Sequence, residues 1–126
     1  MHRTRLFFWL ATVWTLVIVV GLTLPGKSLP AGSLFEFDKA IHFGLFFVLT
    51  LLWLEALAIG RISRALPIFA AIVVFSFLSE VYQQLLPFER TADVFDAVAD
   101  SIGAAVGLAT WGIAHAYWPV KQSQKN

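Results

Sequence analysis

Four long apolar runs, separated by short polar segments, dominate the pattern of hydrophobic and polar positions along the chain. These runs cover residues 6–24, 40–59, 65–86 and 94–118. Each has roughly the 20 predominantly apolar residues that an α-helix needs to cross the hydrocarbon core of a bilayer. The pattern therefore predicts an all-α, polytopic membrane protein. Residues 1–126 would form a single domain with four transmembrane helices and a polar tail over residues 119–126.

The first apolar run lies close to the amino terminus and follows Arg3 and Arg5, an arrangement that also occurs in secretory signal peptides. However, the run is longer than the apolar region of a typical signal peptide, and no clean small-x-small cleavage site follows it. We therefore interpret residues 6–24 as a retained membrane anchor.

Basic residues in the short polar segments predict the orientation of the helices. One side of the membrane would contain the six residues Arg3, Arg5, Arg61, Arg64, Lys121 and Lys125. The opposite side would contain Lys27, Lys39 and Arg90. By the positive-inside rule, the side with more basic residues is cytoplasmic. We therefore expect both termini in the cytoplasm.

Composition agrees with a membrane protein and argues against other classes. The chain is 59% hydrophobic and 13% charged. Its mean hydropathy of +0.77 would give a soluble domain of this size a largely apolar surface. A formal net charge of +1 offers no basic face for nucleic acid, so the expected partners are membrane lipids. The absence of cysteine excludes disulfides, thiolate metal sites and thiol nucleophiles.

Acidic residues are concentrated in one part of the chain, since five of the eight lie within residues 79–100. In the predicted topology, the third helix ends and the fourth begins at the extracytoplasmic face. Glu80 and Asp100 would then each lie about 10 Å into the membrane, at 1.5 Å per residue. His42, near the start of the second helix, would lie in the same layer. We therefore expect a polar pocket in the outer leaflet.

Spacing within the fourth helix places several of these acids on one face. Asp93, Asp96, Asp100, Gly103 and Gly107 follow one another at intervals of three or four residues, which aligns them as one stripe. The stripe is acidic at its outer end and continues as a Gly-xxx-Gly surface. Because small residues let helix backbones approach closely, we assign the two glycines to helix packing.

The second and third helices contribute further polar side chains. Asp38 and His42 are four residues apart on the second helix, with Lys39 beside them, and Glu80 and Gln83 share a face of the third helix. Charged groups at membrane depth avoid lipid and face the interior of the bundle. The expected pocket contains His42, Glu80, Gln83, Arg90, Asp96 and Asp100, with Asp38, Lys39 and Asp93 at its rim.

Several kinds of chemistry fit this set of residues. His42, Glu80 and Asp96 are the candidate catalytic groups, with His42 or Glu80 as the base. Lys39 and Arg90 would hold an anionic headgroup. Carboxylates with a histidine also suit divalent cations. No compact metal motif occurs, so no cofactor is evident from the sequence and a divalent cation remains an alternative. Glu55 and His115 are expected at the cytoplasmic interface, with Glu55 directed toward Arg61 or Arg64.

Three segments resemble the VanZ-like family of small bacterial membrane proteins. "DKAIHFGLFFVL" is similar to its Asp-Lys-x-x-His-Phe segment, and "EVYQQLLPFER" is similar to its Glu-x-x-Gln segment with a following proline. "DAVADSIGAAVG" resembles its Asp-x-x-x-(Asn/Asp)-x-x-Gly-x-x-x-Gly helix. The resemblance covers about residues 25–110, in the order of the family. Two departures occur: Arg90 lies one residue later than the family arginine, and Asp100 occupies a position where asparagine is common.

The resemblance implies a role in the cell envelope, since the named family member is associated with resistance to the glycopeptide antibiotic teicoplanin. We therefore expect a multi-pass protein of the bacterial plasma membrane that binds or modifies an amphiphilic envelope molecule, such as a lipid-linked precursor or a lipoglycopeptide. The alternative is a non-catalytic scaffold or partner protein whose polar cluster locks the helix bundle. Whether the chain is an enzyme or forms a homo-oligomer is left open by its sequence.

Overall fold

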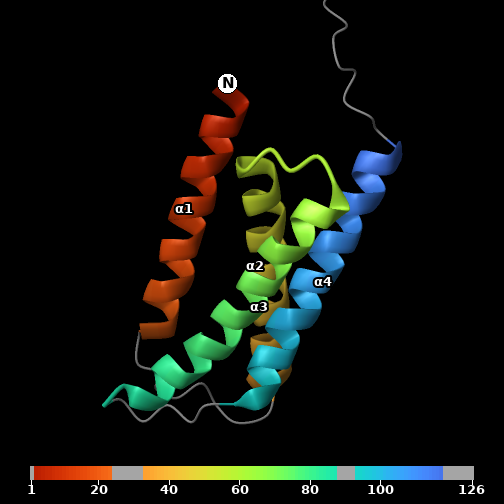
Figure 1. Cartoon of the computed structure of the whole chain (residues 1–126). Coiled ribbons are helices and arrows are strands. Elements are labelled where there is room, and N and C mark those ends of the chain that lie inside the picture. Colours follow the sequence, from red (N-terminus) through yellow and green to blue (C-terminus); the bar gives the residue numbers. More distant parts are fainter. Residues whose placement is uncertain (1, 24–32, 88–92, 118–126) are drawn as a thin grey trace, which may run out of the picture.

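The computed structural model of the protein describes residues 2–23, 33–87 and 93–117. These residues form four α-helices (Figure 1), which are α1 (His2–Thr23), α2 (Ser33–Ala56), α3 (Ile62–Leu85) and α4 (Val94–Tyr117). Each of the four contains a segment that is long and apolar enough to cross a membrane. The predicted architecture of a polytopic α-helical membrane protein is therefore confirmed.

Three of the helices begin before the apolar runs that predicted them, whereas α4 begins at residue 94 as expected and α2 ends at Ala56, three residues before the expected residue 59. α2 begins at Ser33, seven residues before the expected start at residue 40, and α1 begins at His2 rather than at residue 6. Hydropathy detects only the apolar part of a helix, whereas the backbone hydrogen bonds continue through polar residues such as Asp38 and Lys39. These two residues consequently lie within α2 and not in a loop before it.

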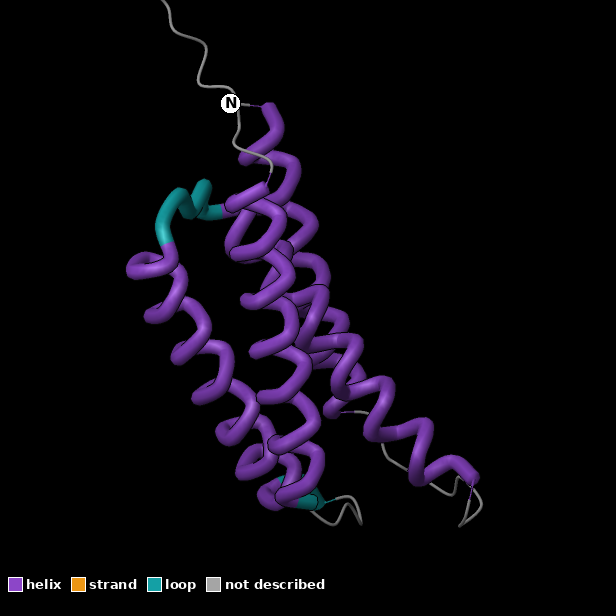
Figure 2. The backbone as a smooth tube through the Cα atoms, turned by 90° about the vertical axis from the view of Figure 1, so that its right-hand side faces the viewer, coloured by secondary structure: helices purple, strands orange, loops and turns teal. Residues whose placement is uncertain are grey.

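The helices run alternately up and down, so the ends of different helices lie next to one another at each end of the bundle. The start of α1, the α2–α3 loop and the end of α4 lie together at the top of Figure 1. We call this the arginine end, because Arg3, Arg61 and Arg64 belong to it. Figure 2 shows the α2–α3 loop in teal at the same end. The starts of α2 and α4 and the end of α3 lie at the opposite end, which we call the carboxylate end. The cytoplasmic location of the arginine end stays a prediction.

α2 and α4 are packed closely through the two glycines of the predicted small-residue surface. A Cβ atom added at Gly103 would overlap the backbone carbonyl oxygen of Phe43 in α2. One added at Gly107 would lie 2.9 Å from the carbonyl oxygen of Phe47 and 3.2 Å from Cβ of Thr50. Only residues without a side chain allow this approach, which brings the polar residues of the two helices within reach of each other.

α1 packs on α2 and leaves a large apolar surface outside the bundle. The indole N–H of Trp14 donates to the carbonyl oxygen of Leu45 at 3.0 Å, and that of Trp53 donates to Thr15 Oγ1 at 3.1 Å. Ile18 of α1 joins the buried core of the bundle. The rest of α1 is mostly exposed and apolar, as expected for a helix in contact with lipid.

Candidate functional site

Buried polar side chains accumulate at the carboxylate end of the bundle. They come from three helices and comprise His42 of α2, Ser76, Ser79, Glu80 and Gln83 of α3, and Asp100 of α4. Burial of polar groups in a membrane protein is expensive unless each finds a partner. Their contacts therefore define what this cluster can do.

Asp100 is at the centre of the cluster and is only 1% exposed. One of its carboxylate oxygens lies 2.8 Å from Nδ1 of His42, and the other accepts a hydrogen bond of 3.0 Å from Ser76 Oγ. This geometry assigns the donor N–H to Nδ1 of His42, because an ionised carboxylate only accepts. Asp100 and Ser76 consequently hold the imidazole in one orientation. Nε2 takes part in neither of these two hydrogen bonds.

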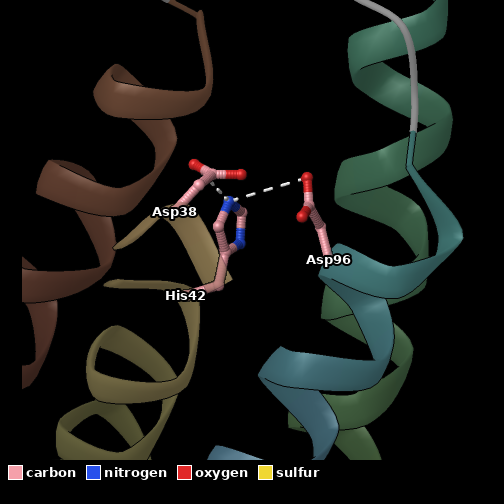
Figure 3. A group of neighbouring side chains, drawn as sticks. All are labelled: Asp38, His42 and Asp96. Atoms are coloured by element: carbon pink, nitrogen blue, oxygen red, sulfur yellow. Dashed lines mark ion pairs between the residues drawn. The ribbon is translucent and has the colours of Figure 1, made fainter. Parts of the chain in front are cut away.

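Nε2 of His42 faces two further carboxylates, as Figure 3 shows. It lies 3.8 Å from Oδ1 of Asp38, on the same helix, and 3.8 Å from Oδ2 of Asp96, at the start of α4. One ligand atom from each of the three residues lies within 4.8 Å of the others, which is close enough to hold a metal ion. Asp38, His42 and Asp96 therefore form a mixed nitrogen and oxygen donor set.

Lys39 connects α2 to the start of α4 beside this set. Its ammonium group donates to Oδ2 of Asp93 at 2.6 Å and also to Oδ1 of Asp96. Together with the backbone N–H of Phe95, the Lys39 ammonium lowers the pKa of the Asp93 carboxyl below its ordinary value. Lys39 is thus already engaged by carboxylates, whereas the sequence suggested that it holds an anionic ligand.

Glu80 of α3 also belongs to the cluster, next to the residues from α2 and α4. It is 8% exposed, and its Oε2 atom accepts the backbone N–H of Asp93 at 3.2 Å. Its Oε1 atom is buried and has no hydrogen-bond partner among the described residues. Glu80 therefore offers an unsatisfied acceptor within the cluster.

Most of the residues expected in one layer of the membrane do come together. The three helices gather Asp38, Lys39, His42, Glu80, Asp93, Asp96 and Asp100, linked by the contacts above. Gln83 is buried on the same face of α3, one turn beyond Glu80. Arg90 lies outside the described residues. Gly103 and Gly107 lie deeper, in the contact between α2 and α4.

Ser76 supplies a hydrogen bond to Asp100 and was not among the residues expected in the pocket. It precedes Glu80 by four residues and therefore lies on the same face of α3. This spacing could have identified it, but a lone serine in an apolar helix more often bonds to its own backbone.

Glu55, at the arginine end, has different partners from those expected. It pairs with Arg3 of α1 at 3.0 Å and lies 3.5 Å from Nε2 of His115 in α4. The expectation of Arg61 or Arg64 rested on closeness in sequence. The folded bundle instead brings the start of α1 and the end of α4 beside the end of α2.

An apolar groove between α1 and α3 lies at the side of the polar cluster. It has a volume of about 270 Å³ and is lined by Val19, Leu22, Phe75, Leu78, Ser79 and Tyr82. A second apolar hollow of about 250 Å³ continues toward the arginine end and shares Phe75 with the first. At the carboxylate end, the hydroxyl groups of Thr23 and Tyr82 lie 3.0 Å apart and connect the two helices.

Comparison with known proteins agrees with the resemblance noted in the sequence. No curated protein and no solved structure gave a significant match. Among protein families, VanZ/LLP1 matches residues 3–115, which include all four helical segments and every described polar residue of the cluster. Because this match covers most of the 126 residues, the chain belongs to the VanZ/LLP1 family of proteins.

Proposed function

We propose that this multi-pass membrane protein binds an amphiphilic molecule of the bacterial cell envelope, such as a lipid-linked precursor or a lipoglycopeptide. The headgroup would lie at the carboxylate end and the acyl chain in the groove between α1 and α3. In this proposal the site opens to the extracytoplasmic face of the plasma membrane. Chemical modification of the bound molecule is a further option, with His42 or Glu80 as the base.

The observation that carries the proposal is the adjacency of a buried polar cluster and an apolar groove. Ser79 lines the groove, and its hydroxyl donates to the carbonyl oxygen of Ser76 at 2.6 Å. Ser76 in turn donates to Asp100. Less than one helical turn therefore separates a surface suited to an acyl chain from one suited to a polar headgroup, as an amphiphile requires.

The described side chains favour a headgroup rich in hydrogen-bond donors. Most of the cluster consists of carboxylates, which accept hydrogen bonds, and Glu80 Oε1 is an unsatisfied acceptor. The ammonium group of Lys39 is already bound to Asp93 and Asp96. Sugar hydroxyls, amides and amines are thus better matched than a bare anion. Glycopeptides and glycosylated lipid precursors both present such groups, in line with the association of the family with teicoplanin resistance.

Native mass spectrometry of protein released gently from membranes tests the proposal. We expect the parent protein to retain an amphiphile of defined mass and the Glu80→Gln variant to retain less of it. Val19→Phe should also reduce retention, because Val19 lines the groove. Val20→Phe is the matched control, since Val20 is exposed and outside the groove. Equal retention of the same mixed lipids by all four proteins would contradict the proposal.

One observation favours the alternative of a scaffold. The contacts of His42, Asp100 and Ser76 connect α2, α4 and α3, so the same polar cluster can lock the bundle without binding a ligand. A scaffold would lose stability with Glu80→Gln or Asp100→Asn and yet carry the same lipids as the parent. Thermal unfolding in detergent, measured on the samples used for mass spectrometry, separates the two functions.

A further inference from the structure

Asp38, His42 and Asp96 present their donor atoms to one point at the carboxylate end (Figure 3). Asp38 and His42 are separated by one helical turn of α2, and Asp96 comes from the first turn of α4. The close contact of Gly103 with the backbone of α2 brings these two helices together. The convergence therefore follows from the packing of the whole bundle, rather than from a local sequence motif.

The distances between these groups suit a shared ion better than a direct hydrogen bond. Nε2 of His42 lies 3.8 Å from each of the two carboxylate oxygens, beyond hydrogen-bonding distance. Two donor atoms that each lie about 2.1 Å from one ion are about 3–4 Å apart, depending on the angle between them. The two separations from Nε2 fall in that range, and the two carboxylates approach it from α2 and α4.

The imidazole is already oriented as metal-binding histidines usually are. Such a histidine donates its second ring N–H to a carboxylate or carbonyl, which fixes the tautomer and raises the basicity of the metal-binding nitrogen. Here Nδ1 of His42 bonds to Asp100, and Ser76 holds the other oxygen of Asp100. Nε2 consequently directs its lone pair toward Asp38 and Asp96.

The balance of acidic and basic groups at the carboxylate end favours binding of a cation. The cluster contains five carboxylates, from Asp38, Glu80, Asp93, Asp96 and Asp100. Among the described residues of the cluster, Lys39 supplies one positive charge, and His42 supplies none while Nε2 is the metal-binding nitrogen, so acidic groups outnumber basic ones. Uncompensated charge is costly within a membrane. A bound divalent cation would remove this cost.

Glu80 provides an independent indication of a missing partner. Its side chain is more than nine-tenths buried, and Oε1 has no hydrogen-bond partner among the described residues. Its other oxygen accepts the backbone N–H of Asp93, whose side chain is connected through Lys39 to Asp96, one of the three donors. A water molecule bound to the cation would satisfy this oxygen. The ammonium of Lys39 donates to Oδ1 of Asp96, whereas Oδ2 is the oxygen that faces Nε2 of His42.

We propose that Asp38, His42 and Asp96 form a binding site for a divalent transition-metal cation of the Zn²⁺ or Mn²⁺ class. Oδ1 of Asp38, Nε2 of His42 and Oδ2 of Asp96 are the three protein ligands. Imidazole favours zinc and the other late metals, whereas carboxylates also suit manganese. Asp100 is a positioning residue that orients His42. This site is a property of the protein alone and does not depend on the binding of an amphiphile.

Titration of the purified protein in detergent with MnCl₂, followed by electron paramagnetic resonance of free Mn²⁺, tests the proposal. The parent should bind one ion per chain, and ZnCl₂ should displace it. Asp38→Asn should weaken binding by more than the roughly 10–100-fold that loss of an orienting residue costs. Asp93→Asn is the matched control, because it removes the same charge from the same cluster without removing a ligand. Its affinity should stay within a few-fold of the parent.

Two results would overturn the proposal. One is a parent protein that binds neither ion at a defined stoichiometry. The other is an equal loss of affinity in Asp38→Asn and Asp93→Asn, which would indicate general attraction by negative charge. Asp100→Asn adds a check on the orienting role and should lose affinity about 10–100-fold. Circular dichroism of each variant establishes that it is folded, and the side chain of Asp38 is exposed enough for its substitution to be tolerated.

Discussion

The two ends of the bundle use the same residue types in different ways. At the arginine end, a single carboxylate, that of Glu55, connects α2 to Arg3 of α1 and His115 of α4. The Arg3 side chain is 71% exposed, so this contact lies at the surface. At the carboxylate end, five carboxylates surround Lys39 and His42, and the side chain of Asp100 is 1% exposed. In the first arrangement one carboxylate has two partners, whereas in the second the acidic groups outnumber the described basic ones.

The packing of α4 against α2 also differs between the two ends of the bundle. Near the carboxylate end, Gly103 of α4 contacts the backbone of α2. A Cβ atom added at Gly112, near the arginine end, would instead meet no atom of another helix within 4 Å. α2 and α4 are therefore pressed together where the polar cluster lies. At the arginine end, α2 and α4 meet instead through the buried side chains of Leu54 and Trp111.

Removal of the Asp100 side chain should have the largest effect on stability. Asp100→Ala removes the partner of the His42 N–H in the interior and leaves the hydroxyl of Ser76 with the longer hydrogen bond of 3.3 Å to the carbonyl oxygen of Ala97. We expect a loss of about 2–5 kcal/mol in the free energy of unfolding. Asp100→Asn retains an acceptor and most of the volume, so it should lose less. Unfolding in detergent measures both, and an Asp100→Ala variant as stable as the parent would contradict the central role of this residue.

Gly103→Ala should be the next most disruptive change. The added methyl group would overlap the carbonyl oxygen of Phe43, a backbone atom that cannot rotate away. Overpacking of this kind costs about 1–3 kcal/mol. Gly112→Ala brings the same gain in helix propensity without a clash, so it should leave stability unchanged or raise it. Comparable melting temperatures for the two variants would show that α2 and α4 do not depend on this close contact.

Asp93 should make a smaller contribution that depends on pH. Because contact with Lys39 lowers its pKa in the folded protein, Asp93 stabilises the fold above its unfolded pKa of about 4. This contribution is lost as the pH falls through the lower folded pKa. The melting temperature of the parent should therefore exceed that of Asp93→Asn at pH 6, and the difference should shrink below pH 4. A difference that is constant across this range would exclude the linkage.

Substitution of Arg3 should have the smallest effect. The pair with Glu55 is exposed on the arginine side, and such pairs contribute up to about 1 kcal/mol. Arg3→Ala should thus lower the melting temperature slightly, and the difference should diminish in high salt because exposed charges are screened. A loss as large as that of Asp100→Ala would mean that the two ends are more alike than their burial indicates.

Several features of the site could be predicted from residue order alone. Once four helices alternate in direction, His42, Glu80, Asp96 and Asp100 lie toward one end, because each is in the half of its helix nearer to that end. The stripe from Asp93 to Gly107 follows from helical periodicity. Contact partners could not be obtained in this way. Glu55 pairs with Arg3, 52 residues away, and no spacing rule relates two different helices.

The sequence by itself determined the number of spans, the end at which the acids gather and the face of α4 that packs on α2, because hydropathy and helical period depend only on residue order. The tertiary structure alone decided that His42 Nδ1 bonds to Asp100, that Nε2 faces Asp38 and Asp96, and that Ser76 completes the set. These contacts depend on the rotation of each helix about its axis and on the distance between helices. Packing of side chains across the bundle sets both, and here the contact of Gly103 with Phe43 brings α2 and α4 close enough to form the cluster.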